Sequence, residues 1–436
     1  MKQEISIEQN EPGVQSRTLP RLLSGRSTLT IILCAMYCLF YLDRVNISQA
    51  AGSIATEFNL TNTQLGVAFS AFSLTYMIGQ AGGGWFARRY GARAVLTFCA
   101  ICVSIATIAT GLVGGLGSLV AARLLVGLGE GPAFATATHA MRNWYPQNQF
   151  GWIQGITHSF ARLGGAIAPP IVATLIVAHS WRFSFVVFGV VSIVWGLIWC
   201  TLFRDDPRTH STISREELAT LPAPSRNTDA RTPFALILHR VIPLTTVFFC
   251  YAWILWMFLS WMPLYFQHKY GQTLGWSATL SGLLLFGGVI GDTLGGIISD
   301  KLLERTGKRW IARSCLIAFA LATCAAFTAL AMLANDIKYV IPLLAAGYFF
   351  LELLVAPLWC VPMDITREHS GLLSGLMNVG VGLAGTISPI AFGYMIDRTG
   401  NWDLPFISAI GILLAGALTC RFMHPDRPLM ESDRSN

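Results

Sequence analysis

The feature of this sequence that most restricts its fold is a series of apolar runs. Each run has about 20 residues, the length that an α-helix needs to cross a bilayer. Short polar breaks separate the runs, apart from one longer break at 204–240. We therefore predict an all-α integral membrane protein with twelve transmembrane helices, at approximately 28–52, 63–87, 94–113, 117–140, 150–178, 184–203, 241–267, 277–299, 311–334, 339–362, 370–396 and 404–423.

The composition argues against the soluble classes of protein. Hydrophobic residues make up 53% of the chain and charged residues only 12%, about half of the ~25% that is usual in a soluble domain. The net charge of +7 is spread thinly over 436 residues, so no nucleic-acid partner is expected. The ten cysteines lie in apolar runs, where we expect them to pack as small residues. The expected surroundings are a lipid bilayer.

The lysines and arginines predict the orientation of the helices. If the N-terminus lies inside, 23 of them fall in cytoplasmic segments, four in outer loops and three within spans. Cytoplasmic loops of membrane proteins carry such an excess. We expect a multi-pass protein of the plasma membrane, the inner membrane in a bacterium, with both termini cytoplasmic.

The long break divides the chain into two halves that repeat each other. Moving the fifth span by 220 residues places Gly151, Gly155 and Pro169 on Gly371, Gly375 and Pro389. Two related six-helix halves suit a secondary transporter whose substrate site lies between them. The predicted parts are a cytoplasmic tail at 1–27, a bundle at 28–203, a cytoplasmic linker at 204–240, a second bundle at 241–423 and a C-terminal tail at 424–436.

Ionisable residues inside a transmembrane helix are costly, so each is a candidate functional residue. Positions three, four or seven apart share a helix face. This spacing gives four helices of the first half a polar stripe: Tyr41 with Arg44, Tyr76 with Gln80, Arg123 with Glu130, and His158 with Arg162.

Arg44 is the first candidate to bind a substrate carboxylate, because a guanidinium donates two parallel hydrogen bonds and stays protonated. The alternative is that a neighbouring acid holds Arg44 for structural reasons only. Asp43 and Glu130 are candidates for proton coupling, because burial and nearby charges control the protonation of a carboxylate. Here the alternative is a static ion pair between Arg123 and Glu130.

Several motifs resemble the major facilitator superfamily across essentially the whole chain. The segment 295–309, with Gly-Gly, Asp-Lys and Arg-x-Gly-Lys-Arg, is similar to the loop signature of that superfamily. The copy in the first half has Arg88 where an aspartate is usual, which weakens the charge relay expected there. The resemblance implies gating roles for Gly84, Arg89, Arg93, Asp300, Arg305, Lys308 and Arg309.

A narrower set of motifs resembles the anion:cation symporter family, whose members carry sugar acids. These motifs are Tyr-Leu-Asp-Arg-Val-Asn at 41–46, Glu-Gly-Pro-Ala-Phe at 130–134 and Trp-Tyr-Pro at 144–146. The resemblance implies protonation at Asp43 and Glu130, with Arg123 as the internal partner of an acid. Asn378, which matches His158 in the repeat, lies where the family has a substrate-contacting asparagine.

Arg162 is a second candidate to bind the substrate. In sugar-acid carriers this region of the fifth span is usually polar but uncharged. A second arginine hints at a dicarboxylate or a larger acid, and a cytoplasm-facing salt bridge is the alternative. Asp292 and Glu352 are expected to brace helices, and His139 to pack. The predicted substrate-binding residues are Tyr41, Arg44, Tyr76, Gln80, His158, Arg162 and Asn378.

The favoured interpretation is a proton-coupled symporter that imports an organic anion by alternating access. The preferred substrate is a sugar acid such as an aldonate, aldarate or hexuronate. The alternative is an aromatic or dicarboxylic acid, which the tryptophans of the second half could stack against. No cofactor is expected besides the coupled proton, and the protein is expected to be a monomer. An intramembrane enzyme would need a nucleophile or metal cluster at depth, and a sensor would need an output domain larger than the 204–240 linker.

Overall fold

The computed structural model describes residues 25–146, 149–210, 213, 215–221, 234–366, 370–427 and 429. Most of the two predicted tails and part of the predicted linker therefore lie outside the described residues. Arg367, which was counted among the inner charges, lies outside them too.

The first half consists of seven α-helices. They are α1 (Gly25–Phe58), α2 (Asn62–Tyr90), α3 (Ala92–Gly111), α4 (Leu116–Glu130), α5 (Ala133–Trp144), α6 (Phe150–Ala178) and α7 (Trp181–Leu202). The break between α4 and α5 falls at Gly131 and Pro132, so the predicted fourth span is made of two helices in sequence. Proline at this position cannot donate the backbone hydrogen bond that a continuous helix needs.

The second half follows a short connecting helix, α8 (Arg215–Ala219). Its elements are α9 (Phe234–Ser260), α10 (Met262–Tyr270), α11 (Leu274–Thr306), the π-helical turn η3 (Ile311–Cys315), α12 (Leu316–Leu333), α13 (Ile337–Leu353), α14 (Val355–Ile365), α15 (Ser370–Thr399) and α16 (Leu404–Thr419). Short 3-10 turns lie at Pro207–Thr209 and Cys420–Phe422.

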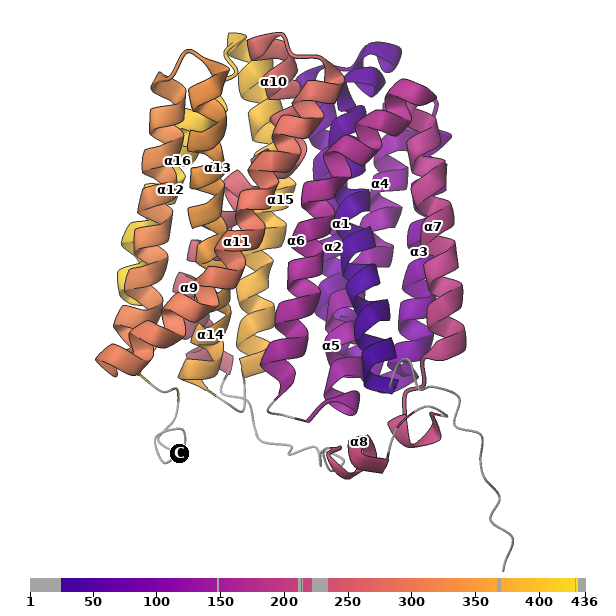
Figure 1. Ribbon diagram of the computed structural model, residues 1–436. Coiled ribbons are helices and arrows are strands. Elements are labelled where there is room, and N and C mark those ends of the chain that lie inside the picture. Colours follow the sequence, from indigo (N-terminus) through magenta and orange to yellow (C-terminus); the bar gives the residue numbers. More distant parts are fainter. Residues whose placement is uncertain are drawn as a thin grey trace, which may run out of the picture.

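The predicted all-α membrane fold is confirmed, with no strand in the part of the chain that the structure describes. Eleven stretches there are long and apolar enough to cross a membrane. The second predicted span, α2, is not among these eleven. It has 29 residues but carries Gln80 and, in its last turn, two arginines. It packs between α4 and α15 within the bundle (Figure 1).

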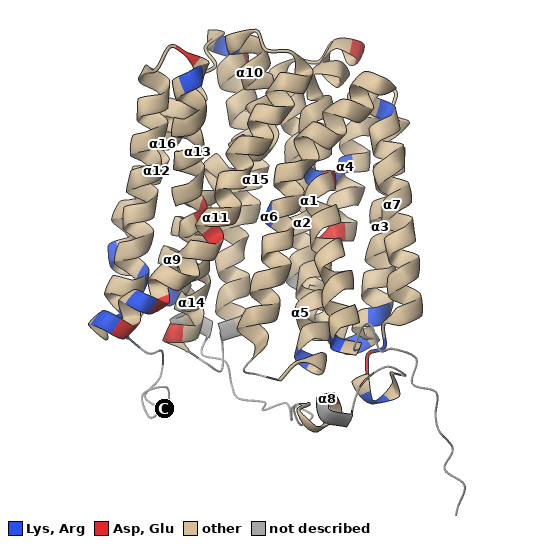
Figure 2. Cartoon of the chain, viewed as in Figure 1, with Lys and Arg blue, Asp and Glu red and all other residues tan. Residues whose placement is uncertain are grey.

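The helices lie side by side along one axis, with α8 at one end of the bundle and α10 at the other (Figure 1). We call these the α8 end and the α10 end. Lysines and arginines gather mainly at the α8 end, as Figure 2 shows. A few charged residues lie at mid-length of the bundle, away from both ends.

Local sequence signals set the ends of several helices. α2 begins with a capping box, in which the Thr61 side chain accepts from the Gln64 N–H and the Gln64 side chain accepts from the Thr61 N–H. α10 and α11 end at Gly271 and Gly307, whose φ angles of +62° and +64° favour glycine.

The two halves meet along α2 with α15 and along α6 with α11. At the α10 end, Asp397 of α15 accepts hydrogen bonds of 2.6–3.0 Å from the backbone and side chains of Asn62 and Thr63 at the start of α2. Further along, Gly66 lies against the backbone of Pro389. The contact between these helices continues to mid-length, where Asn378 donates to Gln80.

Beyond this depth, glycines of these helices have no close neighbour in the other half. At Gly84, one turn past Gln80 on α2, a Cβ would meet no atom of another described segment within 4 Å. The same holds for Gly151 and Gly155 of α6 and for Gly371 and Gly375 of α15. Within the described residues, the halves are thus in contact at the α10 end, whereas these five glycines do not touch the other half at the α8 end.

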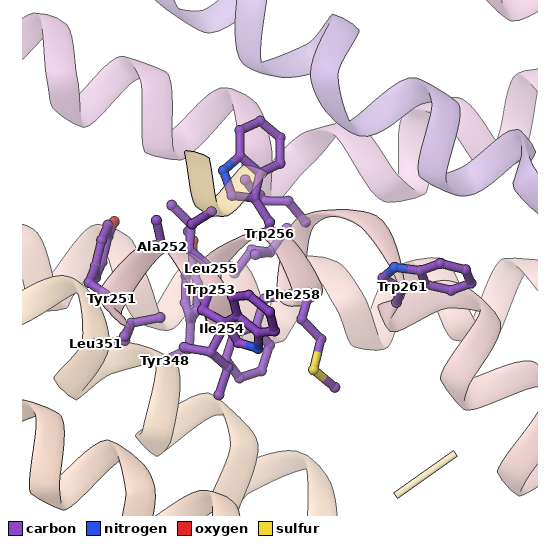
Figure 3. Close-up of a cluster of buried hydrophobic side chains, with 14 of the residues drawn as sticks. Tyr251, Ala252, Trp253, Ile254, Leu255, Trp256, Phe258, Trp261, Tyr348 and Leu351 are labelled. Carbon is purple, nitrogen blue, oxygen red and sulfur yellow. The ribbon is translucent and has the colours of Figure 1, made fainter. Parts of the chain in front are cut away.

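Aromatic side chains fill the core of the second half (Figure 3). Trp253 and Trp256 of α9, and Trp261 between α9 and α10, are at most 9% exposed. Phe258 packs edge-on to Tyr348 of α13, with ring centroids 5.2 Å apart. These rings, which the sequence suggested could stack on an aromatic substrate, are packed against the protein's own core.

Candidate functional site

Arg44 of α1 and Glu130 at the end of α4 form a buried ion pair. The Arg44 Nε donates to Glu130 Oε1 at 2.6 Å, and the Arg44 Nη2 also contacts this oxygen. The Glu130 side chain is 0% exposed and that of Arg44 is 8% exposed. Glu130 Oε2 has no hydrogen-bond partner among the described residues, so the carboxylate retains an open acceptor position.

Four aromatic rings surround the Arg44 guanidinium. Its central carbon lies 4.6 Å from the ring centroid of Tyr76, 4.9 Å from Tyr41 and 5.3 Å from both Phe72 and Phe134. Cations over aromatic faces are attracted by the ring quadrupole, most strongly where water is excluded. These rings restrict the movement of the guanidinium.

Asp43 and Arg123 complete what we call the Arg44 cluster: Asp43, Arg44, Arg123 and Glu130. Asp43 and Arg123 are each 2% exposed. Asp43 interacts electrostatically with Arg123 and Glu130, and Thr107 Oγ1 donates to it at 3.4 Å. Asp43 Oδ1 and Arg123 Nε have no hydrogen-bond partner among the described residues.

The Arg44 cluster is too costly to be explained by stability. Burying a charge carries a penalty of several kcal/mol, and buried ion pairs are often no more stable than apolar residues of similar volume. Here two cations and two anions are buried together with some of their polar atoms unpaired. Such a group is a strong candidate for function.

A second charged group joins the two halves. Arg162 Nη2 of α6 lies 2.8 Å from Glu352 Oε2 of α13, and Arg162 Nε lies 3.6 Å from Asp292 Oδ2 of α11. Tyr251 of α9 is 3.3 Å from both carboxylate oxygens of Glu352. With Tyr41, whose hydroxyl accepts from Arg162 Nη1 at 3.0 Å, these residues form what we call the Arg162 cluster.

The remaining predicted substrate residues lie around the two clusters. Tyr76 accepts from Gln80 at 3.2 Å, and Gln80 accepts from Asn378 across the halves. His158 packs edge-on to Tyr37, with ring centroids 5.4 Å apart. The structure thus brings Gln80 and Asn378 into direct contact across the halves at mid-length.

The predicted gating residues lie at the α8 end, in two separate groups: one around the junction of α2 with α3, the other at the end of α11 and just after it. Arg93 donates to the backbone oxygen of Cys200, at 2.8 Å from its Nε. Asp300 lies 3.4 Å from Arg313, and Arg309 lies 3.7 Å from Asp364. The other gating residues predicted from the sequence are partly or fully exposed: Gly84, Arg89, Arg305 and Lys308.

Some ion pairs differ from those weighed in the sequence. Glu130 pairs with Arg44, so the alternative pair between Arg123 and Glu130 is wrong. The error arose because helical spacing shows only partners on the same helix. The cytoplasm-facing salt bridge considered for Arg162 is also wrong, because its partners Glu352 and Asp292 lie inside the bundle, on the other half.

Two residues that contribute to the arrangement were missed. Tyr251 was not singled out, although a tyrosine near the level of an intramembrane glutamate could have suggested it. Asp397 was not noted either. The signal for Asp397 was an acidic residue at the end of the eleventh predicted span. In the structure this residue lies beside the start of the second span, because α15 packs on α2.

The family model of the Major Facilitator Superfamily matches residues 33–301 and 269–436, two ranges that overlap and cover nearly all of the chain. The chain belongs to the major facilitator superfamily. The match to the family model confirms the resemblance seen in the sequence motifs.

Three relatives resemble this major facilitator protein over most of their length. The chain is 42% identical to a probable sulfoacetate transporter of Cupriavidus necator, over 92% of this chain and 95% of the relative. It is 32% identical to the hexuronate transporter of Bacillus subtilis (88% and 92%) and 30% identical to a D-galactonate transporter of Escherichia coli (90% and 92%). These relatives confirm the predicted similarity to sugar-acid carriers.

A solved structure supports the fold. A bacterial homologue of the human lysosomal transporter Spinster aligns with a TM-score of 0.69 at 19% identity, over 92% of this chain and 95% of the other. With the relatives, it identifies this major facilitator protein as a membrane transporter. The prediction that it is not an enzyme is therefore confirmed.

Proposed function

We propose that the protein is a proton-coupled symporter of a small organic anion. The observation that carries this proposal is the Arg44–Glu130 ion pair, a buried cation held by a carboxylate that a proton could neutralise. The carboxylate of a substrate competes with Glu130 for Arg44, and protonation of Glu130 releases the arginine to the substrate. Proton and anion are bound together by this exchange.

Asp43 and Arg123 supply a second such switch beside the first. When Asp43 takes up a proton, Arg123 loses one of its two anionic neighbours, and the charge of the Arg44 cluster changes. The proton is the only coupling ion that the mechanism needs, and it requires no cofactor. Tyr76, Gln80 and Asn378 are suited to bind substrate hydroxyl or carbonyl groups because each offers a donor or acceptor at this depth.

Coupling to protons gives the transporter a driving force. Taking up an anion against a negative-inside potential is opposed by about 2.3 kcal/mol per charge per 100 mV. If more protons than substrate charges are bound, the complex carries a net positive charge, and the membrane potential then favours its uptake. The excess of lysine and arginine at the α8 end, shown in Figure 2, supports a cytoplasmic location for that end in a bacterial plasma membrane.

The relatives suggest which anions to try first. They are named as transporters of sulfoacetate, hexuronate and galactonate, so we propose sulfoacetate and the sugar acids as candidate substrates. The packed tryptophans of the second half do not favour an aromatic acid.

Uptake into proteoliposomes tests the proposal. Protein reconstituted alone should accumulate one of these labelled anions faster when the outside is acidic. The Asp43→Asn and Glu130→Gln variants should lose this dependence on the gradient, and thermal unfolding checks that each variant is folded. If uptake ignored the gradient, or continued undiminished with both acids neutralised, symport would be wrong.

A further inference from the structure

We propose that Arg162 is a second anion-binding residue of the substrate site. When the transporter is empty, Glu352 binds Arg162 in place of the substrate's anionic group. The substrate is then a small dianion, with one anionic group on Arg44 and the other on Arg162. This inference rests on the proposed function and names its substrate class.

The first support is the state of Arg162 itself. Its side chain is 8% exposed, and its Nε has no hydrogen-bond partner among the described residues. Asp292 Oδ2 lies 3.6 Å from this nitrogen, beyond the usual range of a hydrogen bond. A buried guanidinium with an unused donor at its edge can bind a further anionic oxygen.

The second support is the connection between the halves. Arg162 belongs to the first half, whereas Glu352 and Asp292 belong to the second. Alternating access moves the halves relative to each other, so opening of the α10 end pulls on this pair and, in our proposal, breaks it. A buried arginine left without an anion is strongly unfavourable, and an anionic group of the substrate can replace Glu352.

The third support is the position of Tyr41 beside both arginines. The guanidinium carbon of Arg44 lies 4.9 Å from the Tyr41 ring centroid, and that of Arg162 lies 5.6 Å from it. The two guanidinium carbons can therefore be no further apart than the sum of these two distances. A molecule with two anionic groups separated by one to a few carbon atoms can span them.

Releasing Arg162 leaves Glu352 buried without its cation, so a proton has to bind there as the dianion arrives. Tyr251 can then accept or donate at the neutral carboxyl group. The titratable groups that face Arg162 or Glu352 from the surrounding helices are Tyr41, His158, Tyr251, Asp292, Cys324 and Tyr348. A dianion should therefore bind together with one more proton than a monoanion does.

Binding to the purified full-length protein tests this proposal with two probes. Sulfoacetate carries two anionic groups, whereas carbamoylmethanesulfonate is the same molecule with its carboxylate replaced by a neutral amide. We expect the unmodified protein to prefer sulfoacetate by more than about tenfold, the gain from one added charge-assisted contact. Titration calorimetry in buffers of different ionisation enthalpy should show the extra proton.

The Arg162→Gln and Glu352→Gln variants separate the roles. Arg162→Gln should reduce the preference for sulfoacetate to within about twofold, because the second contact is lost. Glu352→Gln should strengthen sulfoacetate binding and abolish the extra proton. Arg162→Gln combined with Glu352→Gln removes both charges at once, which avoids a lone buried charge if a single variant fails to fold. This double variant should show neither the preference nor the extra proton.

The matched control is Arg182→Gln, which removes an exposed arginine paired with Glu57 at 2.6 Å and should leave the preference unchanged. The proposal is overturned if Arg162→Gln or the double variant keeps the full preference for the dianion. In that case the proposed function still stands, provided that uptake follows the proton gradient. If the protein takes up no organic anion at all, the proposed function itself fails.

Discussion

The Arg44 guanidinium is held on its faces by aromatic rings and at its edge by Glu130. Its shape therefore matters as much as its charge. A planar fork can donate two parallel hydrogen bonds to a carboxylate, whereas an ammonium group is a compact point charge with a different hydration. A lysine at this position would keep the charge balance of the Arg44 cluster but not the fork.

We expect Arg44→Lys to lower uptake by roughly 100-fold while leaving the melting temperature close to that of the unmodified protein, because the charge remains but the two-bond contact is lost. Arg44→Gln should also destabilise the fold, by about 3–5 kcal/mol, since it leaves Glu130 unpaired. Uptake assays and thermal unfolding in detergent measure the two effects. A lysine variant with normal uptake would show that Arg44 does not bind the carboxylate as a fork.

At the scale of the helices, the start of α2 and the end of α15 form the contact that closes the α10 end. One carboxylate, that of Asp397, accepts four hydrogen bonds there. Bonds to an ionised acceptor are roughly twice as strong as neutral ones. The residue therefore favours the arrangement in which the α10 end is closed.

We expect Asp397→Ala to speed hydrogen exchange at the backbone amides of Asn62 and Thr63 by roughly 10-fold or more, because these amides lose a charged acceptor. Hydrogen–deuterium exchange with mass spectrometry measures this. Asp403→Ala is the matched control: Asp403 pairs with Lys269 at the same end but within the second half. Equal effects of the two variants on α2 would mean that Asp397 does not hold the contact.

Close packing of α11 on α13 depends on glycine. A Cβ on Gly291 would meet the backbone of Phe349, whereas one on Gly411 of α16 would face open space. We expect Gly291→Ala to destabilise the protein by about 1–3 kcal/mol through overpacking. Gly411→Ala should be neutral or stabilising by up to ~1 kcal/mol, since alanine favours a helix. Unfolding temperatures compare the two, and a stable Gly291→Ala protein would contradict the packing.

At the scale of the whole molecule, most of the fold was readable from the sequence because spanning a bilayer imposes long apolar helices. The repeat also predicted the two halves. What the sequence could not show is which helices are neighbours. Arg44 and Glu130 were each given a role, but their pairing depends on the way α1 and α4 pack.

The same limit explains the Arg162 cluster. Glu352 was expected to brace helices, and Arg162 was expected either to bind substrate or to form a surface salt bridge. Their contact joins residues 190 positions apart in sequence on different halves. Neither helical periodicity nor the repeat predicts it, because the repeat relates equivalent positions rather than contacting ones.

The orientation of the molecule gives a further prediction. We propose that the α8 end, where lysines and arginines gather, faces the cytoplasm, and we therefore expect a cytoplasmic C-terminus. A C-terminal green fluorescent protein fusion should fluoresce in bacterial cells, and a C-terminal alkaline phosphatase fusion should be inactive. The opposite pattern would reverse the assignment of the two ends.

The start of α2 has a consequence for the transport cycle. All of its first free N–H groups are satisfied: those of Thr61 and Gln64 by each other's side chains, and those of Asn62 and Thr63 by Asp397. When the halves separate at this end, the hydrogen bonds between Thr61 and Gln64 remain, because both residues belong to the start of α2. Only the N–H groups of Asn62 and Thr63 lose their acceptor, Asp397, and bind water instead. The helix is thus built to begin at the same residue in both arrangements, so opening is a rigid separation that leaves no turn to be refolded on the way back.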